Sequence, residues 1–218
     1  MDKKNAELIK EQAILVTNKY DGLEFCEIGD GLFLIKGVLA FEGDYEGMVI
    51  TDAFDIEIQI PPRYPDTLPV VKETGYRIPR EFHTNPEDNT LCLAAPLAAK
   101  LQFALDRTLL GFIEHLVIPF LFNYVHLQKN GVLPFGERSH GAKGILEFYS
   151  EFFQCPDLGV ILKLLKILGT HEYLGFEKCP CKSGKNLRNC HGRQLLKCMQ
   201  LQSTQDFMVE YWGILRLL

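Results

Sequence analysis

Two groups of residues in this sequence have side chains whose types and spacing could do chemistry. The first is a set of three thiols and one imidazole within thirteen residues, made by Cys179, Cys181, Cys190 and His191. Such a Cys3His set suits tetrahedral zinc, and four protein ligands leave no open position for water or substrate. The pattern therefore predicts a structural zinc ion as cofactor. A redox pair of Cys179 and Cys181 is the alternative interpretation.

The second group surrounds Cys92, which follows a polar turn and precedes a short apolar run. A nucleophilic thiol has to be accessible, and its thiolate form must not be suppressed by deep burial. A loop cysteine after a polar turn meets this condition, although free cysteine is also often a small buried hydrophobe. Asn85 could donate a hydrogen bond to a developing oxyanion or brace the turn. His83 is more typical of a residue that fixes the loop, and His140 of a structural histidine.

The elements that position these residues follow from the hydrophobic pattern. Apolar residues at helical spacing predict an amphipathic helix over 4–19, and strict alternation over 54–60 predicts a half-buried antiparallel strand. No period is evident over 73–96, and an irregular stretch of this length is usually a functional loop. The order predicts an α+β fold. The further expected elements are strands over 23–28, 32–41, 48–60 and 69–72, and helices over 106–129, 144–154, 157–168 and 194–216.

Composition and charge exclude several classes of protein. The 218 residues carry a net charge of -5, so no overall field attracts the chain to nucleic acid or to an anionic membrane. The seven cysteines do not form a secreted disulfide framework, and the N-terminus lacks the apolar core of a signal peptide, which predicts a reducing cytoplasmic location. The apolar stretch 109–127 contains Glu114 and Pro119, which favours a buried helix over a membrane span.

The charge is not evenly spread along the chain. Residues 176–200 contain six basic residues against Glu177 alone. This local excess indicates a docking surface for an acidic protein segment or RNA, although lysines that merely solvate an exposed ribbon are the simpler interpretation.

Several short motifs in order carry a resemblance to a known family. The segments Ile60–Pro65, Leu68–Val70, His83-x-Asn85 and Leu91–Leu93 resemble the core of ubiquitin-conjugating enzymes, with Thr84 in place of the proline of the family's His-Pro-Asn motif. The segment from Leu133 to Tyr149 is similar to a divergent prokaryotic branch, some members of which lie in CBASS-type antiphage defence operons. The cysteine cluster resembles the SEC-C motif, which also ends the bacterial secretion motor SecA.

The resemblance implies a four-stranded antiparallel UBC-like domain over 1–155, a helical connector over 156–175, and a SEC-C motif with a terminal helix over 176–218. It implies that Cys92 carries the C-terminus of a protein as a thioester and passes it to a lysine amine, with Asn85 and His83 in supporting roles. No phosphate-binding loop is evident in the sequence, so an activating enzyme would supply the acyl group. The donor would be a ubiquitin-like protein or a defence nucleotide cyclase.

Two rival interpretations remain open at this point. In the first, the same fold is an inert interaction module and Cys92 does no chemistry. In the second, Cys92 is the nucleophile of a thiol hydrolase with His83 or His140, although the sequence shows no acid partner for it. Both enzymatic interpretations need an accessible thiolate at Cys92, whereas the inert module does not.

Overall fold

The computed structural model describes residues 3–29, 31–134, 136 and 139–218. The chain divides into two compact units, which are described separately: the first contains 1–94 and 102–137, and the second contains 95–101 and 138–218. The sequence predicts domain boundaries at 155 and 175; the compact units are divided at 137 and around the segment 95–101. The reason is α5 (Gly141–Phe152), whose apolar face packs against two helices of the second unit.

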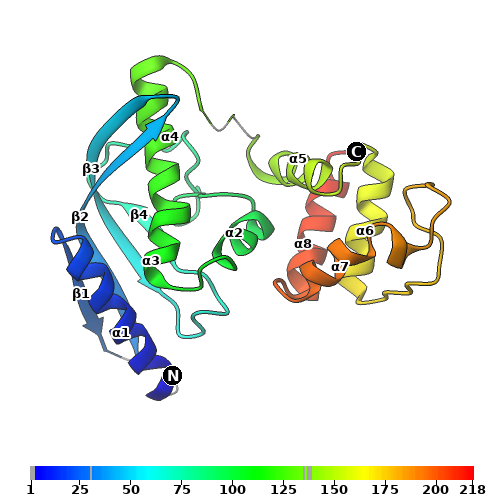
Figure 1. The fold of residues 1–218 in the computed structure, drawn as a ribbon, viewed down its shortest axis with the longest axis horizontal. Helices are drawn as coiled ribbons and strands as arrows, with labels where there is room; N and C mark the ends of the chain where they lie inside the picture. Colours follow the sequence, from blue (N-terminus) through cyan, green and yellow to red (C-terminus); the bar gives the residue numbers. More distant parts are fainter. Residues whose placement is uncertain (1–2, 30, 135, 137–138) are drawn as a thin grey trace. The chain divides into compact units, whose positions relative to one another are not determined.

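The first unit is built on a four-stranded antiparallel sheet (Figure 1). Its strands follow sequence order and confirm the expected meander of an α+β fold. Alternation places one row of side chains on the buried face, so that Phe33 lies opposite Ile60 and Ile35 opposite Ile58. The strands are β1 (Leu23–Ile28), β2 (Leu32–Tyr45), β3 (Met48–Ile60) and β4 (Val70–Glu73).

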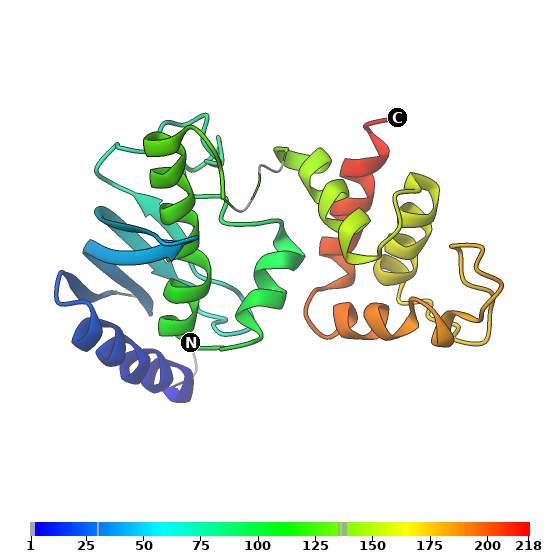
Figure 2. The same cartoon turned by 45° about the horizontal axis from the view of Figure 1, so that its top comes forward.

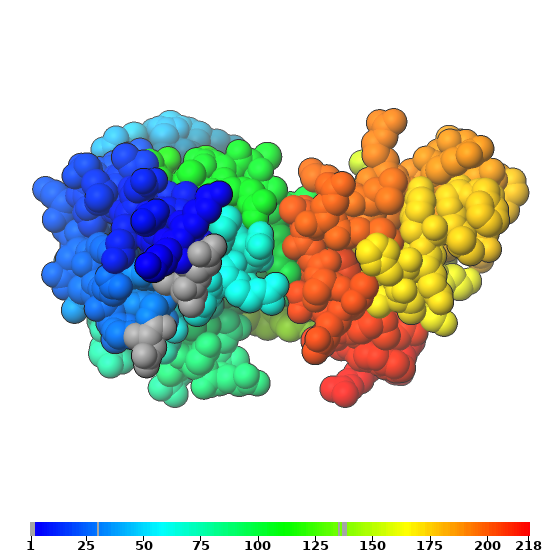
Figure 3. Space-filling view, turned by 90° about the horizontal axis from the view of Figure 1, so that it is seen from below, coloured from blue at the N-terminus to red at the C-terminus, as the bar shows by residue number. Residues whose placement is uncertain are grey.

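Helices cover this sheet. The first, α1 (Lys3–Lys19), buries Ile9, Ala13 and Val16 and contacts β1 and α3 (Leu109–Phe112). Its outer side lies at the surface, dark blue in the space-filling view (Figure 3).

A continuous helical stretch joins α3 through a π-helical turn (Ile113–Val117) to α4 (Ile118–Asn130). The 22 residues Leu109–Asn130 are long and apolar enough to cross a membrane, but two-thirds of the most apolar window, 67%, is buried inside the protein. This burial indicates the core helix that the sequence predicts. At Gly43 of β2 an added Cβ would lie 2.6 Å from the ring of Phe122, so glycine lets α4 approach the sheet.

The segment between β4 and α2 (Pro96–Phe103) contains no further helix or strand among its described residues, as the sequence predicts, apart from an isolated pairing of Thr84 with Leu91. The Leu91 amide donates to the Val71 carbonyl of β4 at 2.7 Å, which ties the segment to the sheet. The sequence analysis misses α2, an eight-residue helix that begins at a proline, the residue whose missing N–H costs nothing at the first helical position.

The second unit is helical (Figure 2). It contains α5, α6 (Leu158–Thr170), α7 (Gly192–Met199) and α8 (Thr204–Leu215). The single helix expected over 194–216 is two helices, because the Ser203 hydroxyl accepts a hydrogen bond from the Asp206 amide and begins a new helix. The Cys-rich segment is part of this unit's core: Cys179 is buried in one cluster with Leu187 and Leu195.

A buried polar pair in this unit gives a pH-dependent prediction. The Tyr149 hydroxyl donates to Glu210 Oε2 at 2.5 Å, and Glu210 is 4% exposed. Burial raises the pKa of Glu210, against the opposing effect of the Tyr149 hydrogen bond. The stability that Glu210 contributes is therefore full below its unfolded pKa and is lost as the pH rises through the higher folded pKa.

We therefore expect Glu210→Gln to raise the thermal midpoint of the second unit relative to the unsubstituted chain, with a difference that grows from pH 5 to pH 8. The fluorescence of Trp212, which is the single tryptophan and lies in α8, reports this transition. Glu172→Gln is the control, because this exposed carboxylate of the same unit does not contribute to the pKa of Glu210, and its effect should be constant over this range. A constant difference for Glu210→Gln as well would contradict the assignment.

Candidate functional site

The structure brings the four predicted metal ligands together. Their donor atoms, three Sγ and one imidazole nitrogen, all lie within 4.8 Å of one another. The Cys179 Sγ lies 3.1 Å from His191 Nδ1, and the Cys181 and Cys190 Sγ atoms are 3.4 Å apart. Tetrahedral thiolate ligands about 2.3 Å from zinc are about 3.8 Å from one another, so these donors converge as a metal site requires. The cluster can hold a metal ion and is compatible with zinc.

Local structure explains why the ligands converge. A hairpin pairs Lys178 with Asn186, and the Cys179 amide donates to the Lys185 carbonyl at 2.9 Å. The hairpin reverses at Gly184, whose φ of +76° is a backbone conformation that glycine adopts at no steric cost. A 3-10 turn (Leu187–Asn189) then returns the chain so that Cys190 and His191 face the first two thiols.

A hydrogen bond to a residue outside the cluster orients the imidazole of His191. Its Nε2 lies 2.9 Å from the carbonyl oxygen of Phe153, at the end of α5, and the residue is 9% exposed. A hydrogen bond donated by Nε2 leaves Nδ1 unprotonated and aimed at the thiols, which is the arrangement expected of an outer-shell partner of a metal-bound histidine.

The thiols differ in acidity. Burial raises the pKa of Cys179 to about 11. Partial burial also acts to raise the pKa of Cys181, but hydrogen bonds, chiefly from Ser183, outweigh it and bring that pKa down to about 6. Because metals bind the deprotonated thiolate, binding here releases protons and depends on pH.

Cys92 lies at the end of a short hairpin in the first unit. The Cys92 amide donates to the His83 carbonyl at 2.7 Å, and the Asn85 amide donates to the Thr90 carbonyl at 2.8 Å. These bonds flank the pairing of Thr84 with Leu91, whose side chain is buried. Since side chains alternate along an extended chain, Thr90 and Cys92 face away from Leu91 and share one side of the hairpin.

The predicted residues around Cys92 are held mainly within the hairpin. The Asn85 side-chain amide donates to the Thr90 hydroxyl at 2.8 Å, and that hydroxyl donates to an Asp88 carboxylate oxygen at 2.7 Å. His83 has a φ of +42°, and its ring packs edge-on against Phe82, with centroids 5.2 Å apart. The structure thus places His83 and Asn85 on the side of the hairpin that pairs with the side carrying Cys92, whereas His140 belongs to the second unit.

Thr90 and Asp88 are residues that the sequence analysis missed. Thr90 is 3% exposed, and its two hydrogen bonds with Asp88 lower the pKa of that carboxyl. The sequence signal is the Asp-Asn-Thr run, because aspartate often accepts from the backbone two residues later in a turn. These residues fix the turn through which the candidate nucleophile is presented.

The Cys92 thiol is half-buried, and burial raises its pKa. Among the residues that the structure describes, no cationic side chain contributes to that shift, so the hairpin alone does not produce the low pKa that marks a self-activated cysteine. As a nucleophile, Cys92 would depend on a partner or substrate that supplies positive charge or a base.

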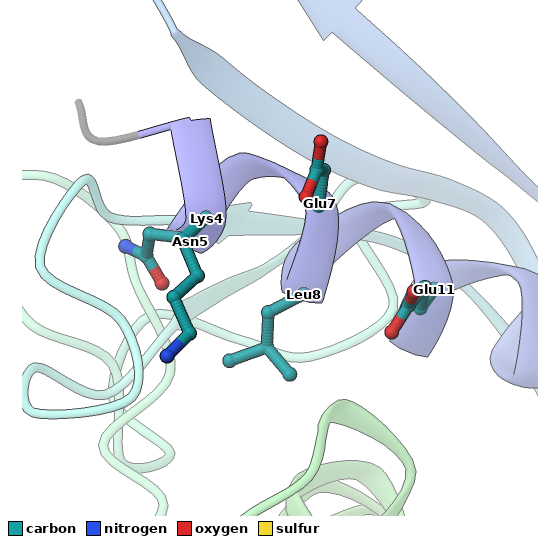
Figure 4. A pocket seen from close by; sticks show the side chains of 5 residues that line it. All are labelled: Lys4, Asn5, Glu7, Leu8 and Glu11. Carbon is teal, nitrogen blue, oxygen red and sulfur yellow. The ribbon is translucent and has the colours of Figure 1, made fainter.

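Two shallow hollows lie on the first unit. One is lined by Asn85, Pro86, Glu87 and Asp88 at the tip of the hairpin. The other lies beside α1, where Figure 4 shows the lining side chains of Lys4, Asn5, Glu7, Leu8 and Glu11. The second contains no thiol or imidazole among its lining residues.

Comparison with known proteins adds no assignment to either site: no family model, curated protein or solved structure matches this chain.

Proposed function

We propose that the chain is a ubiquitin-conjugating-like acyl carrier with a UBC-like first unit. The observation that supports this most directly is the presentation of Cys92 on a braced polar hairpin beside Asn85, after an N-terminal helix and a four-stranded antiparallel meander. This is the element order that the resemblance implies for a thioester-carrying cysteine. Part of the similarity to the prokaryotic branch falls on residues 135, 137 and 138, outside those described.

The reaction would proceed in two acyl transfers. The Cys92 thiol attacks the activated C-terminal carbonyl of a donor protein held by an activating enzyme, the activating group leaves, and the thiol proton is lost to solvent or to that enzyme. A lysine amine then attacks the thioester, an amide forms, and the Cys92 thiol is released. The elevated pKa of Cys92 makes the activating enzyme the source of charge for the first step.

In this proposal the Cys3His cluster holds a structural zinc ion, because three thiolates and an imidazole are the ligand set that zinc prefers and they fill its four positions. The donor would be a ubiquitin-like protein or a nucleotide cyclase of a defence operon, and the setting would be the cytoplasm. These assignments come from the resemblance.

Trapping the acyl intermediate tests the proposal. Cys92→Ser is co-expressed, as tagged full-length chain, with the genes adjacent to its own, and its intact mass is measured after denaturing purification. We expect a mass increment of one protein, joined by an oxyester that mild base cleaves. Cys92→Ala must lack the increment, and Cys26→Ser, which alters another partly buried thiol of the same unit, must still form a thioester.

The raised pKa of Cys92 favours one second candidate, an inert interaction module. In that case the serine variant carries no increment although the adjacent proteins are present and soluble, and Cys92 reacts with iodoacetamide no faster than Cys26.

A further inference from the structure

The two units have opposite charge. The second unit contains twelve Lys and Arg residues against seven Asp and Glu residues, a balance of +5, and the first contains eleven against twenty-one, a balance of -10. Half of the second unit's cations lie in the segment that carries the metal ligands or in the helix that follows it. The net charge of the whole chain hides this basic surface.

The cations of this segment are exposed and have no carboxylate partner. All six are exposed, and none forms a salt bridge within the part of the chain that the structure describes. In the space-filling view the gold and orange atoms of the segment lie at the surface of the second unit (Figure 3). We call these six residues the basic surface: Lys178, Lys182, Lys185, Arg188, Arg193 and Lys197.

The positive charge of the basic surface exceeds the negative charge of the metal site. Three thiolates and a neutral imidazole around a divalent ion leave a charge of about -1. Six cations against this cluster and Glu177 leave a local excess of about four positive charges. Unpaired cations repel one another, so an excess of this size is stabilised by an anionic partner.

An exposed aromatic side chain lies in the same segment of the chain as these cations. Phe176 is 67% exposed, and hydrogen bonds on both sides hold its backbone: the Arg188 amide donates to the Gly175 carbonyl at 3.0 Å, and the Leu187 amide donates to the Glu177 carbonyl at 2.8 Å. The backbone that carries this ring therefore loses little freedom on binding, which lowers the cost of using the ring as a contact. Phe176 is not one of the described residues that form or cover the hydrophobic core of this unit.

We propose that the basic surface and Phe176 bind single-stranded nucleic acid. Proteins that bind single strands without reading their sequence combine cations along the phosphate backbone with aromatic rings on which bases stack. Both parts occur here within the segment that carries the metal ligands and in α7. An acidic peptide would use the cations but offers no flat ring to Phe176, so the exposed aromatic favours the nucleic acid. The inference does not depend on Cys92.

The test uses the zinc-loaded full chain and a fluorescein-labelled 20-nucleotide strand of mixed sequence, as RNA and as DNA. Fluorescence anisotropy is measured from 50 to 200 mM salt. We expect binding of at least one strand that weakens steeply with salt, by about 0.7 in log K per log salt for each phosphate neutralised. Since the whole chain is negatively charged, binding requires a local basic surface.

Matched variants separate the two parts of the surface. Phe176→Ala should weaken binding by about fivefold to a hundredfold with an unchanged salt slope, whereas Trp212→Ala, at another exposed ring of this unit, should leave it unchanged. Lys178→Gln with Lys182→Gln should reduce the slope by about 1.4, and Lys163→Gln with Lys166→Gln, exposed cations of α6, should not. Each variant must retain one equivalent of zinc and its circular dichroism spectrum.

Three results would overturn the proposal. The first is no binding of either strand at 50 mM salt. The second is a loss of binding in Phe176→Ala, or in Lys178→Gln with Lys182→Gln, that is no larger than the loss in the matched control. The third is a 20-residue polyglutamate peptide that binds as tightly as the strands, with Phe176→Ala having no effect, which would assign the surface to an acidic protein.

Discussion

We expect chelation of the metal to unfold the second unit and to leave the first unit folded. On addition of a strong chelator, the amides of α5, α6 and α8 should lose protection from hydrogen exchange, and Trp212 should lose its thermal transition. The amides of β2 and β3 should keep their protection, because the sheet and its helices form a separate compact unit.

The physical reason is that the candidate metal ligands lie in the core of the second unit or pack against it. Cys179 is 4% exposed and His191 9% exposed, and His191 also contacts the last turn of α5 through the Phe153 carbonyl. Structural zinc contributes about 10–16 kcal/mol in small zinc-dependent peptides, against about 5–15 kcal/mol for the net stability of a whole domain. If the cluster holds zinc as proposed, we therefore expect the second unit to lose its core when the ion is removed.

Cys181→Ser should have the same effect as chelation, since it removes one of the four ligands. Cys155→Ser is the matched control, because Cys155 is a partly buried thiol of the same unit outside the cluster. The Cys155→Ser variant should bind one equivalent of zinc and keep the thermal transition reported by Trp212. Persistence of that transition in the chelated chain would show that the metal is absent or peripheral to folding.

The sheet was predictable because local pattern alone determines it. Strict alternation over 54–60 marks β3, and the Glu46-Gly47 turn, where both residues have positive φ, closes a hairpin on β2. The sequence analysis ends β2 at residue 41 because Gly43 resembles a turn residue. In the structure the strand continues to Tyr45, and Gly43 lies within it, where the missing side chain leaves room for the ring of Phe122. No local pattern reveals this contact, because Phe122 is far along the chain.

The candidate sites show the same division between local and distant information. The spacing of Cys179, Cys181, Cys190 and His191 predicts a cluster, and their donor atoms converge. The contact of His191 with Phe153 could not be predicted, because its partner is a backbone carbonyl 38 residues away.

The remaining prediction concerns Asn85, whose two expected roles give different results if the proposed acyl transfer occurs. We expect Asn85→Ala to slow transfer from Cys92 to an amine by about a hundredfold, because a displacement of about 1 Å at a reacting atom costs that much. In the structure the Asn85 side chain donates to Thr90, which indicates that it braces the hairpin.

If Asn85 acts by bracing, Thr90→Val should slow transfer at least as much, because it removes the hydrogen bond from Asn85 and also the one that Thr90 donates to Asp88. The double variant should then be no slower than Thr90→Val alone, because Thr90→Val already removes the bond that Asn85→Ala removes. Single-turnover discharge of the Cys92 thioester to free lysine measures the three rates. Asp66→Asn is the control, since that exposed carboxylate of the first unit pairs with Arg107 and lies outside the hairpin.

A different pattern would assign Asn85 to the chemistry itself. If Thr90→Val discharges at the unsubstituted rate while Asn85→Ala loses a hundredfold or more, the amide acts on the oxyanion of the tetrahedral intermediate, where one positioned donor is worth about 10²–10³ in rate. In that case the hydrogen bond from Asn85 to Thr90 would have to break when the thioester forms, so that the Asn85 amide can reach the oxyanion. Hydrogen exchange of the Thr90 amide in the loaded and free chain would detect that release.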